Sequence, residues 1–264
     1  VFEEEAQLYT APKKEVFDET DYKAAQLIAD RIPNGATLQI GVGRIPDAVG
    51  NLLDGHKDLG VHTEMFSVSL MNLMKKGVIN NSRKSLKPGK TVFAFAGGQR
   101  ATQEIYDFVD NNPDIEMNPI SWVNDPYVVA ELTNFISINS AIAVDLTGQV
   151  CSESIGTTTF SGPGGQADFI RGAKLAPGGQ SYILINSTGK KKDGTLFSKI
   201  NLALAPGSGV TGSRADVQYI VTEYGVAEIR FRSIAERARA MISIAHPQFR
   251  EQLTYEARKA GYFI

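Results

Sequence analysis

The 264-residue sequence is poor in several features that mark particular protein classes. It has one cysteine, Cys151, so no disulfide can form within the chain, and we expect a reducing, cytoplasmic location. Its three histidines, His56, His62 and His246, are too few and too scattered for a typical zinc site, so no metal is expected. No run of about 18 apolar residues occurs, which argues against a transmembrane helix and a membrane partner.

A surplus of either charge is also lacking. There are 27 Lys and Arg against 29 Asp and Glu, a net charge of −2, which excludes the strong basic footprint of a nucleic-acid-binding protein. The basic clusters Lys75–Lys76 and Lys190–Lys192 lie beside glycine-containing turns. Solvated loops are the simpler interpretation of both, and contact with a phosphorylated ligand is the alternative.

Familiar phosphate-binding and nucleophile motifs are missing. Gly41-Val42-Gly43 follows an apolar run, but Pro46 stands where the dinucleotide pattern G-x-G-x-x-G needs its third glycine. Neither the P-loop pattern nor the G-x-S-x-G nucleophile elbow occurs. Cys151 has no histidine near it in sequence and is interpreted as a small buried hydrophobe.

Strand-like and helix-like segments alternate along the chain, which predicts an α/β fold: an open mixed, mostly parallel sheet with helices on both faces. The β-rich stretch 135–222 indicates some antiparallel pairing. Residues 1–18 are interpreted as a linker or arm, and 19–264 as the domain. Expected helices span about 20–31, from Pro46 onward, 67–76, 101–110, 126–132, 233–244 and 247–261. Expected strands are 36–40, 60–64, 91–96, 119–123, 135–139, 141–145, 181–185, 200–204 and 219–222. Strands 135–139 and 141–145 are expected to pair with each other. Lys191–Gly194 is the expected turn between 181–185 and 200–204.

Four glycine-rich segments are candidate ligand-binding loops, because glycine lets the backbone approach a ligand closely and direct N–H groups at it. Taken singly, each is more simply a tight turn. They are Gly41–Gly43, Gly97–Gly98, Gly162–Gly165 and Gly207–Gly212.

Four carboxylates stand beside apolar strands or glycine turns: Glu64, Glu153, Asp168 and Glu223. Glu64 and Glu223 come at expected strand ends, where open α/β sheets bind ligands. Surface or capping carboxylates are the default for three of the four, and the residues alone do not say which is the exception.

Four ordered segments together resemble one family. They are residues 41–49 (GVGRIPDAV), 62–67 (HTEMFS), 161–169 (SGPGGQADF) and 221–225 (VTEYG). Together they resemble the acetyl-CoA hydrolase/transferase family, in particular its 4-hydroxybutyrate and butyryl-CoA:acetate CoA-transferase branch. The resemblance runs from about residue 20 to the C-terminus. It implies a CoA-transferase-like domain, the second of two similar α/β domains, with the first absent from this chain; the missing initiator methionine fits a piece of a longer protein.

The resemblance also implies the roles of particular residues. Glu64 corresponds to the glutamate that attacks the acyl-CoA, and Glu223 is the alternative because related CoA-transferases carry Glu-x-Gly at their nucleophile. The expected contacts to the coenzyme A thioester region are Gly41, Val42, Gly43, Arg44 and Ile45. Further expected coenzyme A contacts are Asn139, Gly162, Gly164, Gly165 and Gln166. For Gln166 three interpretations stay open: it orients Glu64, it binds an intermediate, or it is simply a polar turn residue.

The expected reaction moves coenzyme A between an acyl-CoA and a small carboxylic acid through a glutamyl-CoA thioester. Covalent catalysis of this kind splits one difficult exchange into easier steps. Coenzyme A is then a substrate, with no permanently bound cofactor, and the family suggests a homo-oligomer. Two alternatives stay open: an acyl-CoA hydrolase, and a non-catalytic half that binds coenzyme A only with a partner chain. The acid is not identified, and acetate, butyrate, 4-hydroxybutyrate and propionate all remain candidates.

Overall fold

A computed structural model describes residues 6–10, 17–97 and 101–263 of the chain. Its main feature is an eight-stranded sheet with the order β15-β14-β10-β5-β1-β2-β3-β4. Every neighbouring pair is parallel except the hairpin β14–β15. The predicted open, mostly parallel sheet is therefore confirmed. The strands are β1 (Thr37–Ile40), β2 (Gly60–Phe66), β3 (Thr91–Ala96), β4 (Ile115–Met117), β5 (Phe135–Ser140), β10 (Gln180–Leu184), β14 (Tyr219–Thr222) and β15 (Gly225–Glu228).

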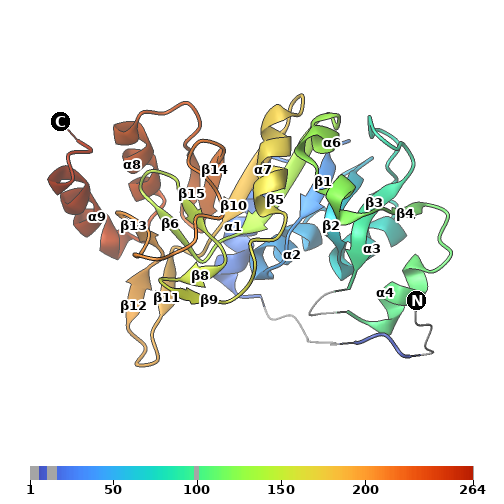
Figure 1. Cartoon of the computed structure of the whole chain (residues 1–264), viewed down its shortest axis with the longest axis horizontal. Coiled ribbons are helices and arrows are strands. Elements are labelled where there is room, and N and C mark those ends of the chain that lie inside the picture. Colours follow the sequence, from blue (N-terminus) through green and yellow to red (C-terminus); the bar gives the residue numbers. More distant parts are fainter. Residues whose placement is uncertain (1–5, 11–16, 98–100, 264) are drawn as a thin grey trace.

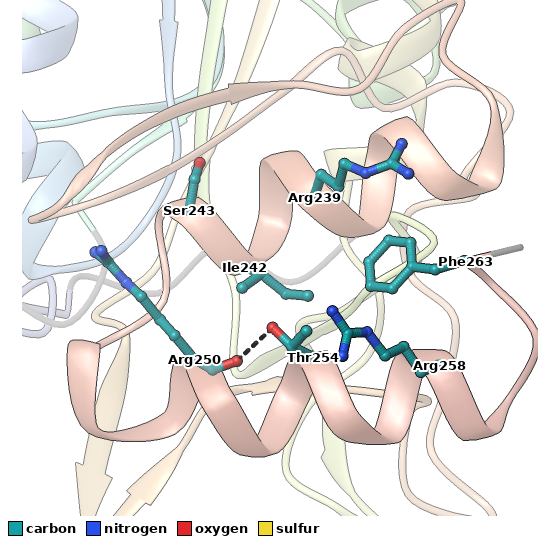
Figure 2. A pocket seen from close by; sticks show the side chains of 7 residues that line it. All are labelled: Arg239, Ile242, Ser243, Arg250, Thr254, Arg258 and Phe263. Carbon is teal, nitrogen blue, oxygen red and sulfur yellow. Dashed lines mark hydrogen bonds between the residues drawn. The ribbon is translucent and has the colours of Figure 1, made fainter.

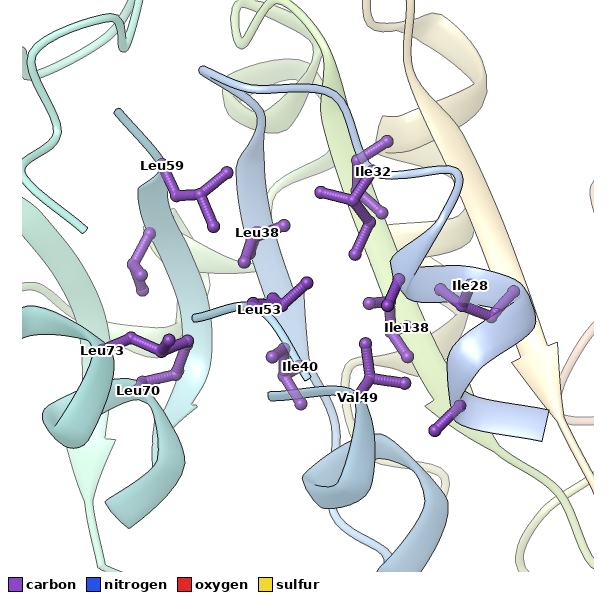
Figure 3. Close-up of a cluster of buried hydrophobic side chains, with 14 of the residues drawn as sticks. Ile28, Ile32, Leu38, Ile40, Val49, Leu53, Leu59, Leu70, Leu73 and Ile138 are labelled. Atoms are coloured by element: carbon purple, nitrogen blue, oxygen red, sulfur yellow. The ribbon is translucent and has the colours of Figure 1, made fainter. Parts of the chain in front are cut away.

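Helices cover both faces of this sheet. Leu38 and Ile40 of β1 pack into the cluster formed with α1 (Glu19–Ala29), α2 (Arg44–Asn51) and α3 (Val68–Lys75) (Figure 3). On the other face, Phe135 of β5 stacks on Phe169 at 6.2 Å between ring centroids. That face carries α5 (Ile120–Val123), α6 (Pro126–Ala130) and α7 (Gln166–Leu175). Both faces of the central strands are buried, and the buried polar side chains among them, Gln39 of β1 with Ser137 and Asn139 of β5, hydrogen-bond to one another.

The remaining elements lie toward the ends of the sheet. Figure 1 shows α8 (Ile234–Ser243) and α9 (Pro247–Lys259) at one end of the molecule and α4 (Gln103–Val109) toward the other. A three-stranded sheet joins β13 (Ile200–Asn201), β6 (Ala143–Asp145) and β7 (Val150–Cys151). Two antiparallel hairpins complete the β-rich stretch, as predicted: β8 (Ser154–Ile155) with β9 (Thr158–Thr159), and β11 (Thr188–Lys190) with β12 (Leu196–Ser198).

Three local predictions are wrong. The expected strand 119–123 is the helix α5, because Pro119, with its fixed φ, takes the N-cap position and the following residues turn into a helix; β4 lies just before it. The expected pair 135–139 and 141–145 belongs to different sheets, since both edges of β5 are already occupied by β1 and β10. Residues Lys191–Gly194 do form a turn, but it closes the hairpin β11–β12, and the strand expected at 200–204 is only the two-residue β13.

Residues 1–5 and 11–16 of the predicted arm lie outside the described residues. Gly98, from the predicted loop Gly97–Gly98, lies outside them as well. Of the arm, residues 6–10 are exposed and without helix or strand. Phe17 packs against the first core cluster, and the Asp18 side chain caps α1 by accepting from the backbone N–H of Asp21 at 2.9 Å. Residues 17 and 18 are therefore in contact with the folded domain, and the predicted boundary between arm and domain stays a prediction.

Candidate active site

The order of the strands in the sheet reverses at β1. Strands β2, β3 and β4 are added on one side of β1, and β5 then returns to its other side. In open α/β sheets ligands bind at the carboxyl ends of strands where the order reverses in this way. The loop Gly41–Gly43, which follows β1, and Ser140, which ends β5, meet at this point, where the Ser140 hydroxyl donates to the Val42 carbonyl at 2.9 Å.

The glycines of this loop are required by close contacts. A Cβ at Gly41 would lie 2.3 Å from the Asn139 amide oxygen, and one at Gly43 would lie 2.8 Å from the Ser140 hydroxyl. Gly43 also has φ +145°, a conformation that other residues rarely adopt. The loop therefore lies tightly on the end of β5 and leads directly into α2.

Glu64 is a half-buried residue of β2, two positions before the end of the strand at Phe66. Its Oε2 accepts two hydrogen bonds, from the Asn124 side-chain amide at 3.0 Å and from the Gly165 backbone N–H at 2.9 Å. Asn124 is the C-cap of α5, and Gly165 is the N-cap of α7. In the described part of the chain Glu64 makes no ion pair, so its second oxygen, Oε1, is not neutralised by a cation.

His62 lies two residues before Glu64 on the same strand and fixes the segment that carries Asn124. Its buried Nε2 donates to the Val123 carbonyl at 2.7 Å, and its ring lies 5.6 Å from that of Trp122. Burial lowers the pKa of His62 to about 4, so the ring is neutral near pH 7. Because Asn124 follows Val123 directly, this bond holds the amide donor in register with Glu64.

The loop Gly162–Gly165 approaches Glu64 through its last member. A Cβ at Gly165 would lie 2.3 Å from both Glu64 Oε2 and the Asn124 amide nitrogen, whereas nothing lies within 4 Å of one at Gly162 or Gly164. Gly165 also begins α7, and a helix N-terminus stabilises negative charge. Of the two loops, this one therefore contacts the predicted nucleophile directly.

Gln166 and Asp168 lie in the first turn of α7. Gln166 is buried, and its Nε2 has no hydrogen-bond partner among the described residues. This free amide group directly follows Gly165, whose N–H donates to Glu64. Partial burial raises the pKa of the Asp168 carboxyl, and the nearby Glu64 adds to the rise. The role of Gln166 toward Glu64 or an intermediate stays a prediction.

Three other predicted coenzyme A contacts have neighbours within the fold. Arg44 pairs with Asp18 at 2.9 Å and with the buried Asp21 at 2.7 Å. Ile45 is buried in the first core cluster. The Asn139 amide donates to Gln39 at 2.9 Å and to Ser137 at 3.0 Å. Val42, by contrast, is 57% exposed at the open side of its loop.

The competing carboxylates are engaged elsewhere. Glu223, at the end of β14, accepts from the Ser187 backbone N–H at 2.9 Å and from its hydroxyl. Glu153 accepts from the Thr211 hydroxyl at 3.0 Å. In the sheet order β10, β5 and β1 separate β14 from the strand of Glu64, so Glu223 and Glu64 belong to different sites. Cys151 is buried, as expected of a small hydrophobe.

Asn124 is the site residue that sequence reasoning missed. The expected strand ended at Val123 and the expected helix began at 126, so Asn124 lay between them with no assigned role. The one usable signal was the Asn124-Asp125-Pro126 run, since Asp125 caps α6 and Pro126 occupies its first turn. A helix start at 126 places Asn124 in the junction between two helices, the kind of position from which an amide can reach a neighbouring strand.

Neither a metal site nor a membrane span is found in the part of the chain that the structure describes. No group of three or more His, Cys, Asp or Glu side chains there is arranged to hold a metal ion. Within the same residues, no helix combines the length and apolar character needed to cross a membrane.

Comparisons with known proteins agree on one family. Residues 101–257 match the model of the acetyl-CoA hydrolase/transferase C-terminal domain. The 4-hydroxybutyrate coenzyme A transferase of Clostridium kluyveri is 52% identical over 88% of this chain and 52% of its own length. The butyryl-CoA:acetate CoA-transferase of Anaerostipes caccae is 45% identical over 92% and 54%. The chain thus spans about half the length of these relatives.

A solved structure supports the fold over nearly the whole chain. RipA from Yersinia pestis superposes with a TM-score of 0.89 at 39% identity, covering 98% of this chain and 57% of its own. Here too the match ends at roughly half of the longer protein. The helices and strands described above therefore correspond to a little over half of that longer chain.

Proposed function

The chain belongs to the acetyl-CoA hydrolase/transferase family, and we propose that it is the C-terminal half of a CoA-transferase with Glu64 as the nucleophile. The observation that carries the proposal is the hydrogen bonding of Glu64: Oε2 is held by Asn124 and Gly165, and no cation among the described residues pairs with Oε1. A carboxylate held at one oxygen and unneutralised at the other is oriented for attack. The names of the two curated relatives, both CoA-transferases, support this assignment.

The first step forms a mixed anhydride. Glu64 Oε1 attacks the thioester carbonyl carbon, the C–S bond breaks, and coenzyme A leaves as its thiolate. The thiolate then attacks the Glu64 carboxyl carbon, the bond from that carbon to Oε1 breaks, and the first acid leaves as a carboxylate that carries Oε1. The product on the protein is a glutamyl-CoA thioester, and the incoming acid returns through the same two steps in reverse.

The donors that hold Glu64 in the resting state also suit the second step. When the thiolate attacks the Glu64 carboxyl carbon, Oε2 becomes the oxyanion of the tetrahedral intermediate. Asn124 and Gly165 already donate to this oxygen at 3.0 and 2.9 Å. Donors aligned before reaction need no reorganisation as charge develops, which is why a single such donor is worth about 10²–10³ in rate.

The proposed substrates are an acyl-CoA and a small carboxylic acid such as acetate. The proposed coenzyme A contacts are those of the two glycine loops and β5: Gly41, Val42, Gly43, Arg44, Ile45, Asn139, Gly162, Gly164, Gly165 and Gln166. The missing N-terminal domain would form the opposite wall of the acid pocket and exclude water, which would otherwise hydrolyse the thioester. A cytoplasmic homo-oligomer is the proposed setting.

The experiment uses the full-length protein with an acyl-CoA in the presence and absence of acetate. We expect acyl-CoA loss that depends on acetate, and after borohydride reduction of the acyl-CoA-treated protein we expect the modified residue to be Glu64. Glu64→Ala should abolish transfer, and Glu64→Asp should nearly do so, because the shorter side chain retracts the carboxylate. Loss of acyl-CoA at the same rate without acetate would make the protein a hydrolase. Labelling of Glu223 would refute the assigned nucleophile, and full activity of Glu64→Ala would leave this half a non-catalytic binding module.

A further inference from the structure

A groove between α8 and α9 is not used by the proposed reaction. It lies at the β15 end of the sheet, and β14, β10, β5 and β1 separate that strand from β2, which carries Glu64. Its volume of about 710 Å³ is within the range of small-molecule sites. Three arginines line it together with two hydroxyls and two apolar side chains: Arg239, Arg250 and Arg258, Ser243 and Thr254, and Ile242 and Phe263 (Figure 2).

Two of the arginines are held in place by aromatic rings. The Arg239 guanidinium lies 5.0 Å from the centroid of the Phe263 ring. Arg250 lies 5.6 Å from the Tyr224 ring, and its Nε donates to the Ala245 carbonyl at 2.9 Å. A guanidinium that is already stacked loses less conformational freedom when it binds an anion.

The arrangement gives the groove two charged ends. Figure 2 shows Arg239 and Arg258, on facing helices, on either side of Phe263, while Arg250 lies at the opposite end near Ser243. The apolar side chain of Ile242 lies between these ends. A ligand that fills the groove therefore meets positive charge at both ends and an apolar surface between them.

Little of this charge is neutralised within the described residues: Glu236 interacts electrostatically with Arg239 but forms no ion pair with it. In the described residues none of Arg239, Arg250 and Arg258 forms an ion pair, although other surface arginines do: Arg232 with Glu228 at 3.7 Å and Arg171 with Asp216 at 3.2 Å. Like charges gathered in one groove repel, so an anion bound there relieves the repulsion as well as gaining charge-assisted hydrogen bonds.

We propose that this groove binds a small organic ligand carrying at least two phosphate groups, of the nucleotide class. The guanidinium fork matches phosphate oxygens in pairs, and two anionic groups joined by a less polar body fit the two charged ends. A single small carboxylate engages only one end. Two sources share this chemistry, a free nucleotide and the phosphorylated end of coenzyme A. The site does not depend on Glu64, so it can be tested whatever the reaction is.

Calorimetric titration of the full-length protein tests the site with ADP and adenosine 3′,5′-bisphosphate as probes and adenosine as the uncharged control. We expect the phosphorylated probes to bind and adenosine not to. Arg239→Gln and Arg258→Gln should each weaken binding about tenfold or more, since each removes charge-assisted hydrogen bonds to phosphate. Arg232→Gln is the matched control: it changes an arginine that pairs with Glu228 outside the groove and should leave binding unchanged.

A second arm identifies the source of the ligand. If the probes compete with coenzyme A, the groove receives the phosphorylated end of that substrate; if they bind together with it, the groove is a separate nucleotide site. The Glu64→Ala variant should bind the probes as the unmodified protein does. Absence of binding at millimolar concentration would refute the proposal. So would unchanged affinity in Arg239→Gln and Arg258→Gln variants that melt at the temperature of the unmodified protein.

Discussion

The backbone N–H of Gly165 donates a hydrogen bond of 2.9 Å to Glu64 Oε2 across 101 residues of sequence. The same oxygen accepts from Asn124, 60 residues away from Glu64. The proposed nucleophile lies on a strand, and both of its donors lie at the ends of helices on one face of the sheet. Small changes at these helix ends should therefore affect the reaction more than the stability of the fold.

Gly165→Ala should reduce transfer by about 10² or more with little change in melting temperature. The added Cβ would lie 2.3 Å from Glu64 Oε2, so the carboxylate or the α7 terminus must move and the N–H donor is misaligned. The measurement is kcat for transfer in the full-length protein. Gly55→Ala is the matched control, because its Cβ would also meet nothing within 4 Å and Gly55 is not among the proposed coenzyme A contacts. Equal activity of the two variants would contradict the proposed geometry.

Asn124→Ala should lower kcat by about 10²–10³ and change KM for the acyl-CoA much less. The side-chain amide donates to the oxygen on which negative charge develops, so its removal acts mainly on the transition state. Asn118→Ala serves as the control, since that amide donates to Glu116 rather than to Glu64. A rise in KM with unchanged kcat would assign Asn124 to ground-state binding instead.

The main sheet could be predicted because it depends on local patterns, whereas the choice of Glu64 as the nucleophile rests on the family resemblance and stays a prediction. Short apolar runs followed by Gly41 or Glu64 indicate parallel strands that end in ligand loops, and the ordered motifs selected Glu64 among four carboxylates. The family resemblance is confirmed by the match over residues 101–257. The assigned roles of the site residues stay predictions.

Long-range contacts could not be predicted in the same way. Pro119–Val123 is short and mostly apolar, a pattern that suits a strand or a helix equally. In the structure it is a helix whose Val123 carbonyl accepts a hydrogen bond from His62, a contact between distant segments. The role of Asn124 follows from that packing and has no signature of its own. Gly165 was assigned to coenzyme A, and nothing in the sequence showed that its N–H points at a carboxylate on β2.

His62 should make the protein less stable in mild acid. Its pKa is lowered to about 4 in the folded state, against about 6.5 in the unfolded chain, so the unfolded chain binds more protons between these values. The free energy of unfolding therefore falls as pH drops from 6.5 to 4, by about 3 kcal/mol for this residue. The measurement is the difference in unfolding free energy between the unmodified protein and His62→Gln across this range. A difference that does not vary with pH would show that His62 is not held neutral.

Gly172→Ala should destabilise the protein, by about 1–3 kcal/mol for overpacking. The new Cβ would lie 2.4 Å from Val129 Cγ1, where α7 packs on α6. This cost exceeds the gain of up to about 1 kcal/mol from replacing a helical glycine by alanine. Thermal unfolding measures it, and the double variant Val129→Ala with Gly172→Ala should recover most of the loss, because the space removed at one position is restored at the other. Failure of this recovery would show that the contact is not what limits residue 172.

The separation of Glu64 from its two donors also bears on synthesis of the chain at the ribosome. When β2 emerges, neither Asn124 nor Gly165 has been made, and the carboxylate has no partner to orient it. Parallel strands and their long-range contacts form late in folding, because the chain between them must first be closed into a loop. A nascent or half-folded chain therefore carries the glutamate without its oriented chemistry. In the proposed function, Glu64 therefore becomes competent to attack a thioester only when the fold is complete.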